Sequence, residues 1–509
     1  MAEKFLIGKG ENPVYINTSK LNRHGFITGA TGSGKTITLK VMAENLSKLG
    51  IPVFLSDVKG DVASLSMAGE TDENIAERVA NNGLEDYEPR KFPVEYFDVF
   101  AENGIALRTT VSEMGPILIS RLLGLNAIQE GILNICFAIA DEKGWLLIDL
   151  KDLRAMLNYV GENASELSKV YGNVTVQSVG AILRSLLVLE QQGGEKFFGE
   201  PDFKIEDFLR VDENGQGIIN ILAAEKLSNS PLLYSTFLLW LLSELYENLP
   251  EVGDLDKPKV VFFFDEAHML FDKKNSAVLE KIELIARLIR SKGVGVFFIT
   301  QKATDIPENI LAQLGNRIQH TLRAYTPKEQ KDVKAIADSF RQDGKVDLVE
   351  EILNLKVGQA VVSVMDDEGK PTFAEKILVN PPESKIGVVD PNIRQQTINQ
   401  SLLYDKYAEY FDGESAYELI NENNLKVEAE KQRAQQEALD QKEAERLAKE
   451  EAKAAEKIRK EQEKEIKKED QAKSKRKTGM IDRVTNNVLG AVGREIGRQI
   501  TRGIFGTRR

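Results

Sequence analysis

A glycine-rich turn near the start of the sequence has the residue types and the spacing that hold a polyphosphate. It fits G-x-x-x-x-G-K-[ST] in full, with Gly29, Ala30, Thr31, Gly32, Ser33, Gly34, Lys35 and Thr36 as its members. Glycines let successive backbone N–H groups point at phosphate oxygens, and the helix that follows adds its positive dipole end. In this pattern the lysine reaches the outer phosphates and the hydroxyl ligates the bridging Mg²⁺. We therefore predict a site for ATP and Mg²⁺, with Lys35 as a catalytic charge and Thr36 as a metal ligand.

The residues on either side of the turn match the context that such a loop needs. Residues 24–28 are typical of a short buried strand, and residues 37–49 carry apolar side chains at helical spacing. A chance match in an ordinary glycine turn is the alternative, and it requires neither a strand before nor a helix after. The sequence predicts strand, phosphate loop and helix in that order.

Two adjacent carboxylates, Asp265 and Glu266, follow the apolar run VVFFF at 260–264. Ligands of open α/β sheets bind beyond the carboxyl ends of the strands, which places this pair beside the phosphate loop. There Asp265 would hold the Mg²⁺ shell and Glu266 would polarise an attacking water. A helix N-cap is the alternative role for the pair. Transfer of phosphate to a small molecule needs no second carboxylate to activate water, so the pair indicates hydrolysis of ATP.

A glutamine, Gln301, ends the next apolar run, FFITQ at 297–301. An amide at this position can touch both the γ-phosphate and the attacking water, and so report phosphate loss to the sheet. Capping of the strand end is the alternative. Residues 265–268 also spell DEAH, but the downstream Ser-Ala-Thr and Q-x-x-G-R-x-G-R motifs of DEAH-box helicases do not occur. The sequence therefore argues against that helicase class.

These side chains need a sheet that brings several strand ends together. From residue 24 to about 380 the sequence alternates short apolar runs with amphipathic segments, which is typical of an α/β fold with a mostly parallel sheet. The further runs predicted as strands are 51–57, 217–222, 259–267, 293–301, 317–325 and 359–365. We predict a core of residues 24–60 and 205–380, a short N-terminal segment over 1–23 and a largely helical insertion over 61–204.

The composition changes beyond the core. Residues 381–425 form a predicted connecting segment, and residues 426–478 consist almost wholly of Ala, Glu, Lys, Gln and Arg. Such a run predicts a long charged helix with i,i+4 acid-base pairs. It has few apolar a and d positions, so a solvated single helix is favoured and a coiled coil is the alternative. Residues 479–509 predict a basic, glycine-rich amphipathic helix, for which docking on protein is favoured over nucleic acid or a membrane surface.

Composition and charge restrict the class of protein. No apolar run reaches the length of a bilayer span and no signal-peptide layout begins the sequence, so we expect a cytoplasmic protein without a membrane span. The single cysteine, Cys136, lies in an apolar run and is predicted to be a buried free thiol. The net charge of -12 does not exclude nucleic acid, because acids can be segregated away from a basic channel.

Several of these motifs together resemble the ATPase domain of the HerA and FtsK group of hexameric DNA translocases. The resemblance spans residues 20–380 and rests on the phosphate loop, FFFDEAH at 262–268, residues 285–320 and the late strands. More narrowly, the short N-terminus, LSDVKGD at 55–61 and the glycine-arginine tail are similar to the bacterial HerA-like DUF853 proteins. Archaeal HerA proteins carry a β-barrel before the phosphate loop, where this sequence has only a short segment, so a role in DNA end resection is not expected.

The resemblance implies a RecA-like (ASCE) P-loop NTPase core, a homo-oligomeric ring with a hexamer preferred, and ATP-driven movement on DNA with duplex favoured. By position, Lys35 and Thr36 correspond to the Walker A pair, Asp265 and Glu266 to the Walker B pair, and Gln301 to the sensor.

In such rings an arginine of the neighbouring subunit completes the site. Arg317 is the first candidate and Arg323 the second, with a plain surface arginine as the alternative for each. The basic residues Arg287, Arg290, Lys292 and Lys302 flank the strand before Gln301, and either line a pore or subunit contact or are solvated helix ends.

A function of a different class stays open beside the translocase. The acidic balance and the long Glu/Lys run also suit a nucleotide-switched assembly protein that recruits a protein partner through its C-terminal helix.

Overall fold

One sheet of 12 strands runs through the first part of the chain in this computed structural model, which describes residues 3–271 and 276–474. Strands β10 to β6 are parallel, whereas β11, β12, β1 and β2 pair antiparallel at the other end. The mostly parallel α/β sheet that the sequence predicts is confirmed. In spatial order the strands are β2 (Pro13–Asn17), β1 (Lys4–Lys9), β12 (Glu375–Val379), β11 (Gln359–Ser363), β10 (Asn316–Gln319), β3 (Gly25–Thr28), β9 (Val294–Thr300), β8 (Val260–Phe264), β4 (Val53–Asp57), β7 (Ile219–Ala223), β5 (Val94–Asp98) and β6 (Ile105–Ala106).

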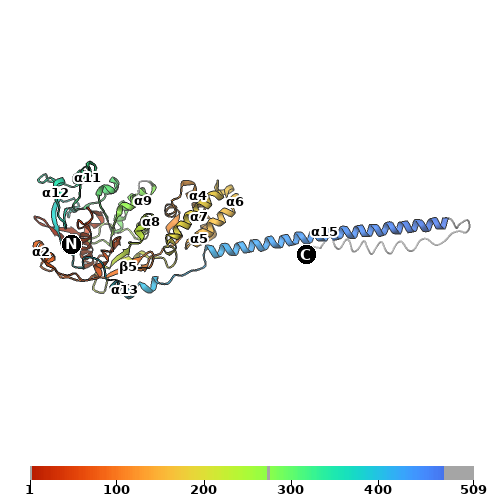
Figure 1. The fold of residues 1–509 in the computed structure, drawn as a ribbon, viewed down its shortest axis with the longest axis horizontal. Coiled ribbons are helices and arrows are strands. Elements are labelled where there is room, and N and C mark those ends of the chain that lie inside the picture. The colour runs from red at the N-terminus through yellow and green to blue at the C-terminus, as the bar shows by residue number, and fades with distance from the viewer. Residues whose placement is uncertain (1–2, 272–275, 475–509) are drawn as a thin grey trace. The chain divides into compact units, whose positions relative to one another are not determined.

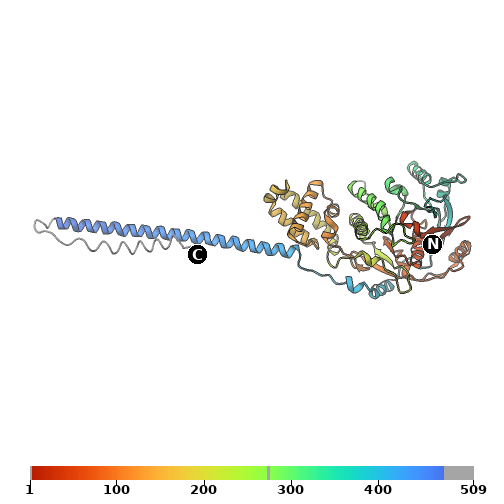
Figure 2. The same ribbon diagram turned by 180° about the vertical axis from the view of Figure 1, so that it is seen from behind.

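Helices connect the strands and surround the sheet (Figures 1 and 2). The described α-helices are α1 (Lys35–Lys48), α2 (Glu73–Asn82), α3 (Val111–Leu122), α4 (Ala127–Lys143), α5 (Leu150–Glu162), α6 (Ala164–Tyr171), α7 (Val176–Gln191), α8 (Pro231–Asn248), α9 (Ser276–Leu288), α10 (Glu308–Leu311), α11 (Pro327–Asp338), α12 (Leu348–Asn354), α13 (Pro391–Gln400), α14 (Tyr404–Tyr407) and α15 (Ala416–Ser474).

The central strands are apolar on both faces, so the register of the sheet is strongly specified. All five residues of β8 are buried, and Phe263 stacks on Phe297 of β9 with ring centroids 5.2 Å apart. Strands buried on both faces are typical of parallel sheets with helices on each side. In this register Thr28 at the end of β3 pairs with Thr300 at the end of β9. The segments that follow β3, β9 and β8 therefore leave the sheet at one edge.

The stretch 61–204, predicted as a largely helical insertion, contains α2 to α7 and also β5 and β6, which extend the sheet beyond β7. Two acids, Glu95 and Asp98, interrupt the apolar pattern of β5, and each has a hydrogen-bonding partner. Glu95 pairs with Arg210 at 2.9 Å, and Asp98 accepts the backbone N–H of Phe100 at 2.8 Å. Helices α4 to α7 lie at the opposite end of this part from α11 and α12 (Figure 1). Cys136 in α4 is a buried free thiol, as predicted.

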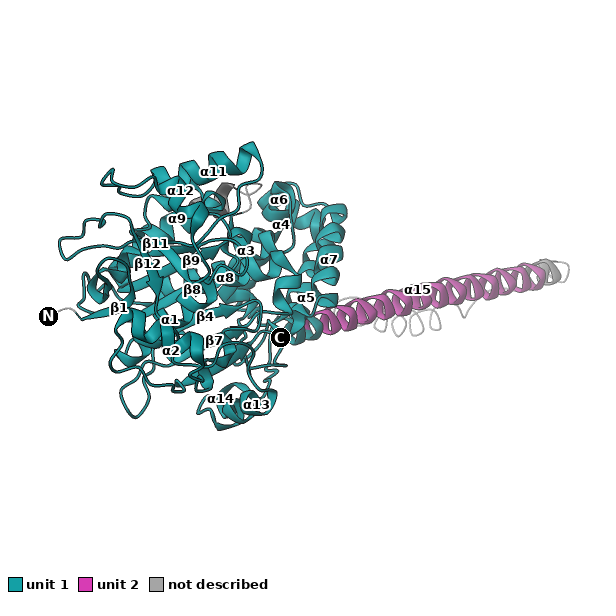
Figure 3. Ribbon diagram, turned by 60° about the vertical axis from the view of Figure 1, so that its left-hand side comes forward, with its two compact units in different colours: residues 1–422 teal, residues 423–509 magenta. Residues whose placement is uncertain are grey.

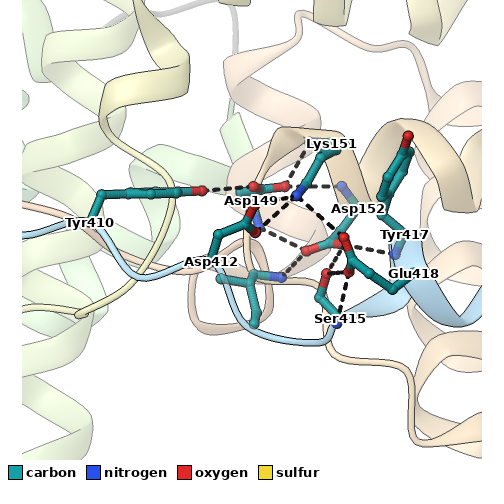
Figure 4. A network of polar contacts seen from close by, with 9 residues as sticks. Asp149, Lys151, Asp152, Tyr410, Asp412, Ser415, Tyr417 and Glu418 are labelled. Atoms are coloured by element: carbon teal, nitrogen blue, oxygen red, sulfur yellow. Dashed lines mark hydrogen bonds and ion pairs between the residues drawn. The ribbon is translucent and has the colours of Figure 1, made fainter.

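The segment between β12 and α15 runs back along the core to these inserted helices. At its far end the Tyr410 hydroxyl donates to Asp149 at 2.8 Å, and Lys151 pairs with Asp412 at 2.8 Å (Figure 4). The backbone N–H of Tyr417 donates to Asp152 at 2.9 Å in the same network (Figure 4). The inserted helices and the start of α15 are therefore fastened to one another by charged contacts.

The chain divides into two units, residues 1–422 and 423–509 (Figure 3). Helix α15 begins at Ala416 rather than at 426, and its side chains from 423 to 469 are exposed, with ion pairs such as Glu456–Lys460 at i,i+4 spacing. The predicted long charged helix is confirmed. The predicted basic helix over 479–509 lies outside the described residues. Among the described helices none is by itself long and apolar enough to span a bilayer; only α6 and α7, bent by 104° at their junction, meet the length and composition requirement as a pair.

Candidate active site

The phosphate loop joins β3 to α1 in the conformation that glycine allows. Gly29 has φ 151° and Gly34 has φ 114°, in the left-handed half of backbone space where a side chain is strained. A Cβ on Gly29 would also lie 2.6 Å from the Cβ of His320, just past β10. The loop is therefore curled tightly against the neighbouring strand, and strand, loop and helix follow in the predicted order.

Lys35 and Thr36 open α1 and point to different parts of the site. The Lys35 ammonium donates to the Gly29 and Ala30 carbonyls at 2.5 and 3.1 Å. Burial lowers the pKa of Lys35, and the charge of nearby Lys59 lowers it further. The Thr36 hydroxyl donates to an Asp61 carboxylate oxygen at 3.1 Å. The Lys35 ammonium thus lies against the phosphate loop, whereas the Thr36 hydroxyl faces Asp61.

Asp265 follows β8 at the same edge and is held by its own backbone. Its N–H donates to the Ser56 hydroxyl oxygen at 2.9 Å, and its carbonyl accepts the Tyr234 hydroxyl at 2.8 Å. Desolvation raises the pKa of Asp265 to about 6, with the neighbouring Glu266 charge adding to the effect. A cation beside this carboxylate would favour its ionised form, because opposite charge counters the cost of burial.

Glu266 is buried, and its backbone is left-handed with φ 48°, which is uncommon for a residue with a side chain. Its carboxylate lies between an imidazole and an ammonium group, with His268 Nδ1 at 3.3 Å from one oxygen and Lys59 Nζ at 3.4 Å from the other. The hydrogen bond from His268 is the main reason why the pKa of Glu266 falls to about 2. The pKa values of the two adjacent acids are therefore shifted in opposite directions, with that of Glu266 the lower.

A cavity of about 340 Å³ lies beside the phosphate loop and Asp265. Its polar lining includes Thr31, Lys35, Thr36, Lys59, Asp61 and Asp265, and its outer wall includes Val357, Ile386 and Gly387. The oxygen donors Thr36, Asp61 and Asp265 are of the kind that Mg²⁺ prefers. Among the described residues no group of three or more His, Cys, Asp or Glu side chains is arranged to hold a metal ion by itself.

Gln301 follows β9, which lies between β3 and β8 in the sheet. Its side chain is exposed and has no hydrogen bond to protein in the described part of the chain. The strand order alone therefore places this amide between the phosphate loop and the acid pair. The alternative reading, an amide that caps its own strand end, has no supporting contact among the described residues.

A second cavity, of about 300 Å³, lies at the opposite, amino-terminal edge of the same strands. Four arginines are among its lining residues: Arg23, Arg287, Arg290 and Arg317. One acid stands nearby, Asp254, whose carboxylate lies 3.9 Å from Arg23 and 3.4 Å from Arg290. The site is strongly cationic although the chain as a whole carries a net charge of -12.

The two candidate trans arginines lie at different edges. Arg317 is on β10 in the arginine cavity, where its guanidinium donates to the backbone carbonyls of Leu314 and Ser339. Arg323 is exposed just beyond the carboxyl end of β10, on the same side as the phosphate loop of its own chain. The structure thus places Arg317 and Arg323 at opposite edges of the sheet, a difference that the sequence alone did not reveal.

Lys59 and Asp61 are site residues that the motifs did not point to. Both belong to the loop after β4, in the stretch LSDVKGD, to which the sequence assigned no role in the site. A signal was present, since charged residues directly after a buried parallel strand fall at the ligand-binding edge.

The chain is similar to known proteins over most of its length. The profile of a family described as "Helicase HerA-like C-terminal" matches residues 3–509. The DNA double-strand break repair helicase HerA of Sulfurisphaera tokodaii is 26% identical over 400 residues, covering 75% of this chain and 70% of that protein. Its namesake in Sulfolobus acidocaldarius is 24% identical over 405 residues, covering 77% and 72%.

Among solved structures, the bacterial conjugative coupling protein TrwBdeltaN70 has a TM-score of 0.50 at 14% identity, covering 76% of this chain and 91% of that one. This likeness concerns the fold, and it confirms the predicted RecA-like core with its parallel sheet. Because the family profile extends over nearly the whole sequence, the chain belongs to the HerA-like C-terminal helicase family.

Proposed function

We propose that this protein is a ring-forming ATPase that couples ATP hydrolysis to translocation on, or unwinding of, duplex DNA. The observation that carries the proposal is the strand order β3, β9, β8, which brings the phosphate loop, Gln301 and the Asp265–Glu266 pair to one edge of the sheet. Family membership and relatives named as DNA repair helicases support DNA as the partner.

Each side chain at this edge has a role that its position supports. The backbone N–H groups of residues 29–34 and the Lys35 ammonium bind the phosphates. Magnesium held by Thr36 and Asp265 would neutralise charge on the bound triphosphate. Glu266, just beyond the end of β8, accepts the proton of the attacking water. Gln301 orients that water and carries the loss of the phosphate to β9.

The arginine cavity supports assembly head to tail. A residue that acts on a neighbour's nucleotide has to lie on a face away from its own, and the cavity at the amino-terminal edge meets that condition. Closed rings of identical subunits join two different faces in this way. Arg317 stays the first candidate for the trans contact, now together with Arg23, Arg287 and Arg290, and Arg323 stays the second. A hexamer is the preferred ring.

The test is the ATP turnover of the purified chain with and without duplex DNA, over a series of salt concentrations. Stimulation that weakens as salt rises is expected, because phosphate contacts release counterions. Lys35→Ala serves as the control without nucleotide binding. Turnover that is indifferent to duplex and single-stranded DNA at every salt concentration would contradict the DNA assignment.

The exposed charged helix α15 favours a second candidate, a nucleotide-switched assembly protein that recruits a partner through this helix. Deletion from residue 426 onward separates the two functions. If DNA-stimulated turnover survives the deletion and only a bound protein is lost, the helix is an adaptor on a motor. If turnover never responds to DNA and binding of the partner follows the nucleotide state, the assembly function is correct.

A further inference from the structure

The loop after β4 is built to hold its side chains in fixed positions. β4 ends at Asp57, whose buried carboxylate accepts the backbone N–H groups of Gly60, Val62 and Ala63 at 2.8, 3.1 and 2.9 Å. Three hydrogen bonds to one carboxylate fold the backbone around that group. Lys59 stands in this turn, so the position of its Cα is set by the buried Asp57 carboxylate.

This loop contacts both halves of the nucleotide site. On one side Asp61 accepts the Thr36 hydroxyl at 3.1 Å, and on the other the Lys59 ammonium lies 3.4 Å from a carboxylate oxygen of Glu266. Lys59 lines the same cavity as the phosphate loop and Asp265. A third segment of the chain therefore belongs to the site, beside the Walker A and Walker B residues.

We propose that Lys59 is a second lysine for the γ-phosphate, shared between that group and Glu266. The inference rests on the proposed ATPase function. Lys59 has the reach for both contacts, because its side chain is 42% exposed and extends into the cavity from a fixed backbone. Its charge already acts on Lys35, the residue expected to meet the outer phosphates. Two ammonium groups around one phosphate balance charge that a single lysine leaves uncompensated.

This arrangement makes the contact specific for the triphosphate. With ATP bound, the γ-phosphate offers Lys59 an anionic partner inside the cavity that Lys59 and Asp265 line. With ADP bound, that phosphate is missing and Glu266 is the remaining partner. Lys59 therefore lets the site tell ATP from ADP, through a residue that the Walker motifs do not contain.

Equilibrium binding of fluorescent ATPγS and ADP to the full chain tests this role without depending on turnover. Lys59→Met keeps most of the side-chain length and removes the charge. It should weaken ATPγS binding about tenfold while ADP binding stays within about twofold, because only the triphosphate loses a charged contact. Lys59→Arg should restore most of the ATPγS affinity. The matched control is Lys169→Met on α6, an exposed lysine that pairs with Glu166 at 2.7 Å, which should change neither affinity.

The possible results separate the role of Lys59 from the ATPase function itself. Equal weakening of ATPγS and ADP would mean that Lys59 only supports the fold of its loop, and would overturn the inference. So would a Lys59→Met protein that binds both ligands like the Lys169→Met control. A wild-type chain that binds neither ligand would contradict the ATPase function, and the role of Lys59 with it.

Discussion

At the carboxyl edge of the sheet, acids and lysines share one cavity, whereas the amino edge gathers four arginines with a single acid beside them. The first arrangement suits a phosphate and a metal ion together, because it supplies both signs of charge. The second is mainly cationic and suits an anion that arrives from outside. The same parallel strands thus carry two sites of different charge at their two ends, and the head-to-tail ring proposed above would bring such sites of neighbouring subunits together.

The largest expected effect comes from the base at the carboxyl edge. Glu266→Gln keeps the size of the side chain and removes its ability to accept a proton, so turnover should fall about a hundredfold or more while nucleotide still binds. Lys35→Ala should instead weaken nucleotide binding, because its charge serves ground state and transition state alike. Turnover and ATPγS affinity, measured on both variants, check this separation. Near-normal turnover in Glu266→Gln would move the base to another residue.

The next largest effect is expected from Arg317, acting on the nucleotide site of a neighbouring subunit. Arg317→Ala should lower turnover at least about tenfold while leaving nucleotide binding near normal, since a trans arginine acts on charge in the transition state. Mixing Arg317→Ala subunits with Glu266→Gln subunits should restore part of the turnover, because some interfaces then pair an intact base with an intact arginine. No recovery in mixtures whose subunits demonstrably exchange would transfer the trans role to Arg323 or to another arginine of the cavity.

His24, which lines the arginine cavity, is expected to make the stability of the chain depend on pH. The Nδ1 of His24 accepts the backbone N–H of Val296 at 3.1 Å, and burial, together with the charges of Arg290 and Arg23, lowers the pKa of His24 to about 4. The unfolded chain takes up this proton below its ordinary pKa of about 6.5, whereas the folded chain does so only near pH 4. The contribution of His24 to stability is therefore complete above pH 6.5 and is lost as the pH falls toward 4.

We therefore predict how the free energy of unfolding changes with pH rather than its value at one pH. Between pH 7 and pH 5 the wild-type chain should lose about 2 kcal/mol that His24→Asn does not lose. Urea unfolding at both pH values measures the difference. The buried His320 behind the phosphate loop, whose pKa burial also lowers to about 4, remains in both proteins and serves as the internal reference. Parallel losses in the two proteins would show that His24 titrates normally when folded.

The smallest effect is expected from the single acid at the arginine edge. Asp254 is 62% exposed and lies 3.4 to 3.9 Å from its two arginine partners, so these ion pairs contribute little. Asp254→Asn should change the free energy of unfolding by less than about 1 kcal/mol and leave nucleotide affinity unchanged. A larger loss of stability would mean that Asp254 organises the cavity, and that the arginines there are bound to their own chain rather than held ready for a neighbour.

Much of the carboxyl edge could be predicted because its signals are contiguous. The phosphate loop, the acid pair after VVFFF and the glutamine after FFIT are each a few residues long, and each depends on the strand or helix directly beside it. The long charged helix was predictable for the same reason, since its composition acts through neighbours three and four residues away.

The strands β5 and β6 could not be predicted from such local patterns. Glu95 and Asp98 break the apolar run of β5, and only Arg210 and the backbone after the strand make those acids acceptable in a buried position. The antiparallel end also depends on distant segments, because β1 pairs with β12 from the other end of the core and β2 pairs with β1.

By itself the sequence determined the class of chemistry, which follows from residue types at short spacing: a phosphate loop, a buried strand that ends in two acids, and an amide at the end of the next. The tertiary structure alone decided which strand lies between β3 and β8, that Lys59 and Asp61 belong to the site, and that Arg23, Arg287, Arg290 and Arg317 share one cavity. The physical reason is range. Hydrogen-bonding and apolar preferences act between neighbours along the chain, whereas charges from distant segments meet only after strand order and register have been set by the packing of the buried strands.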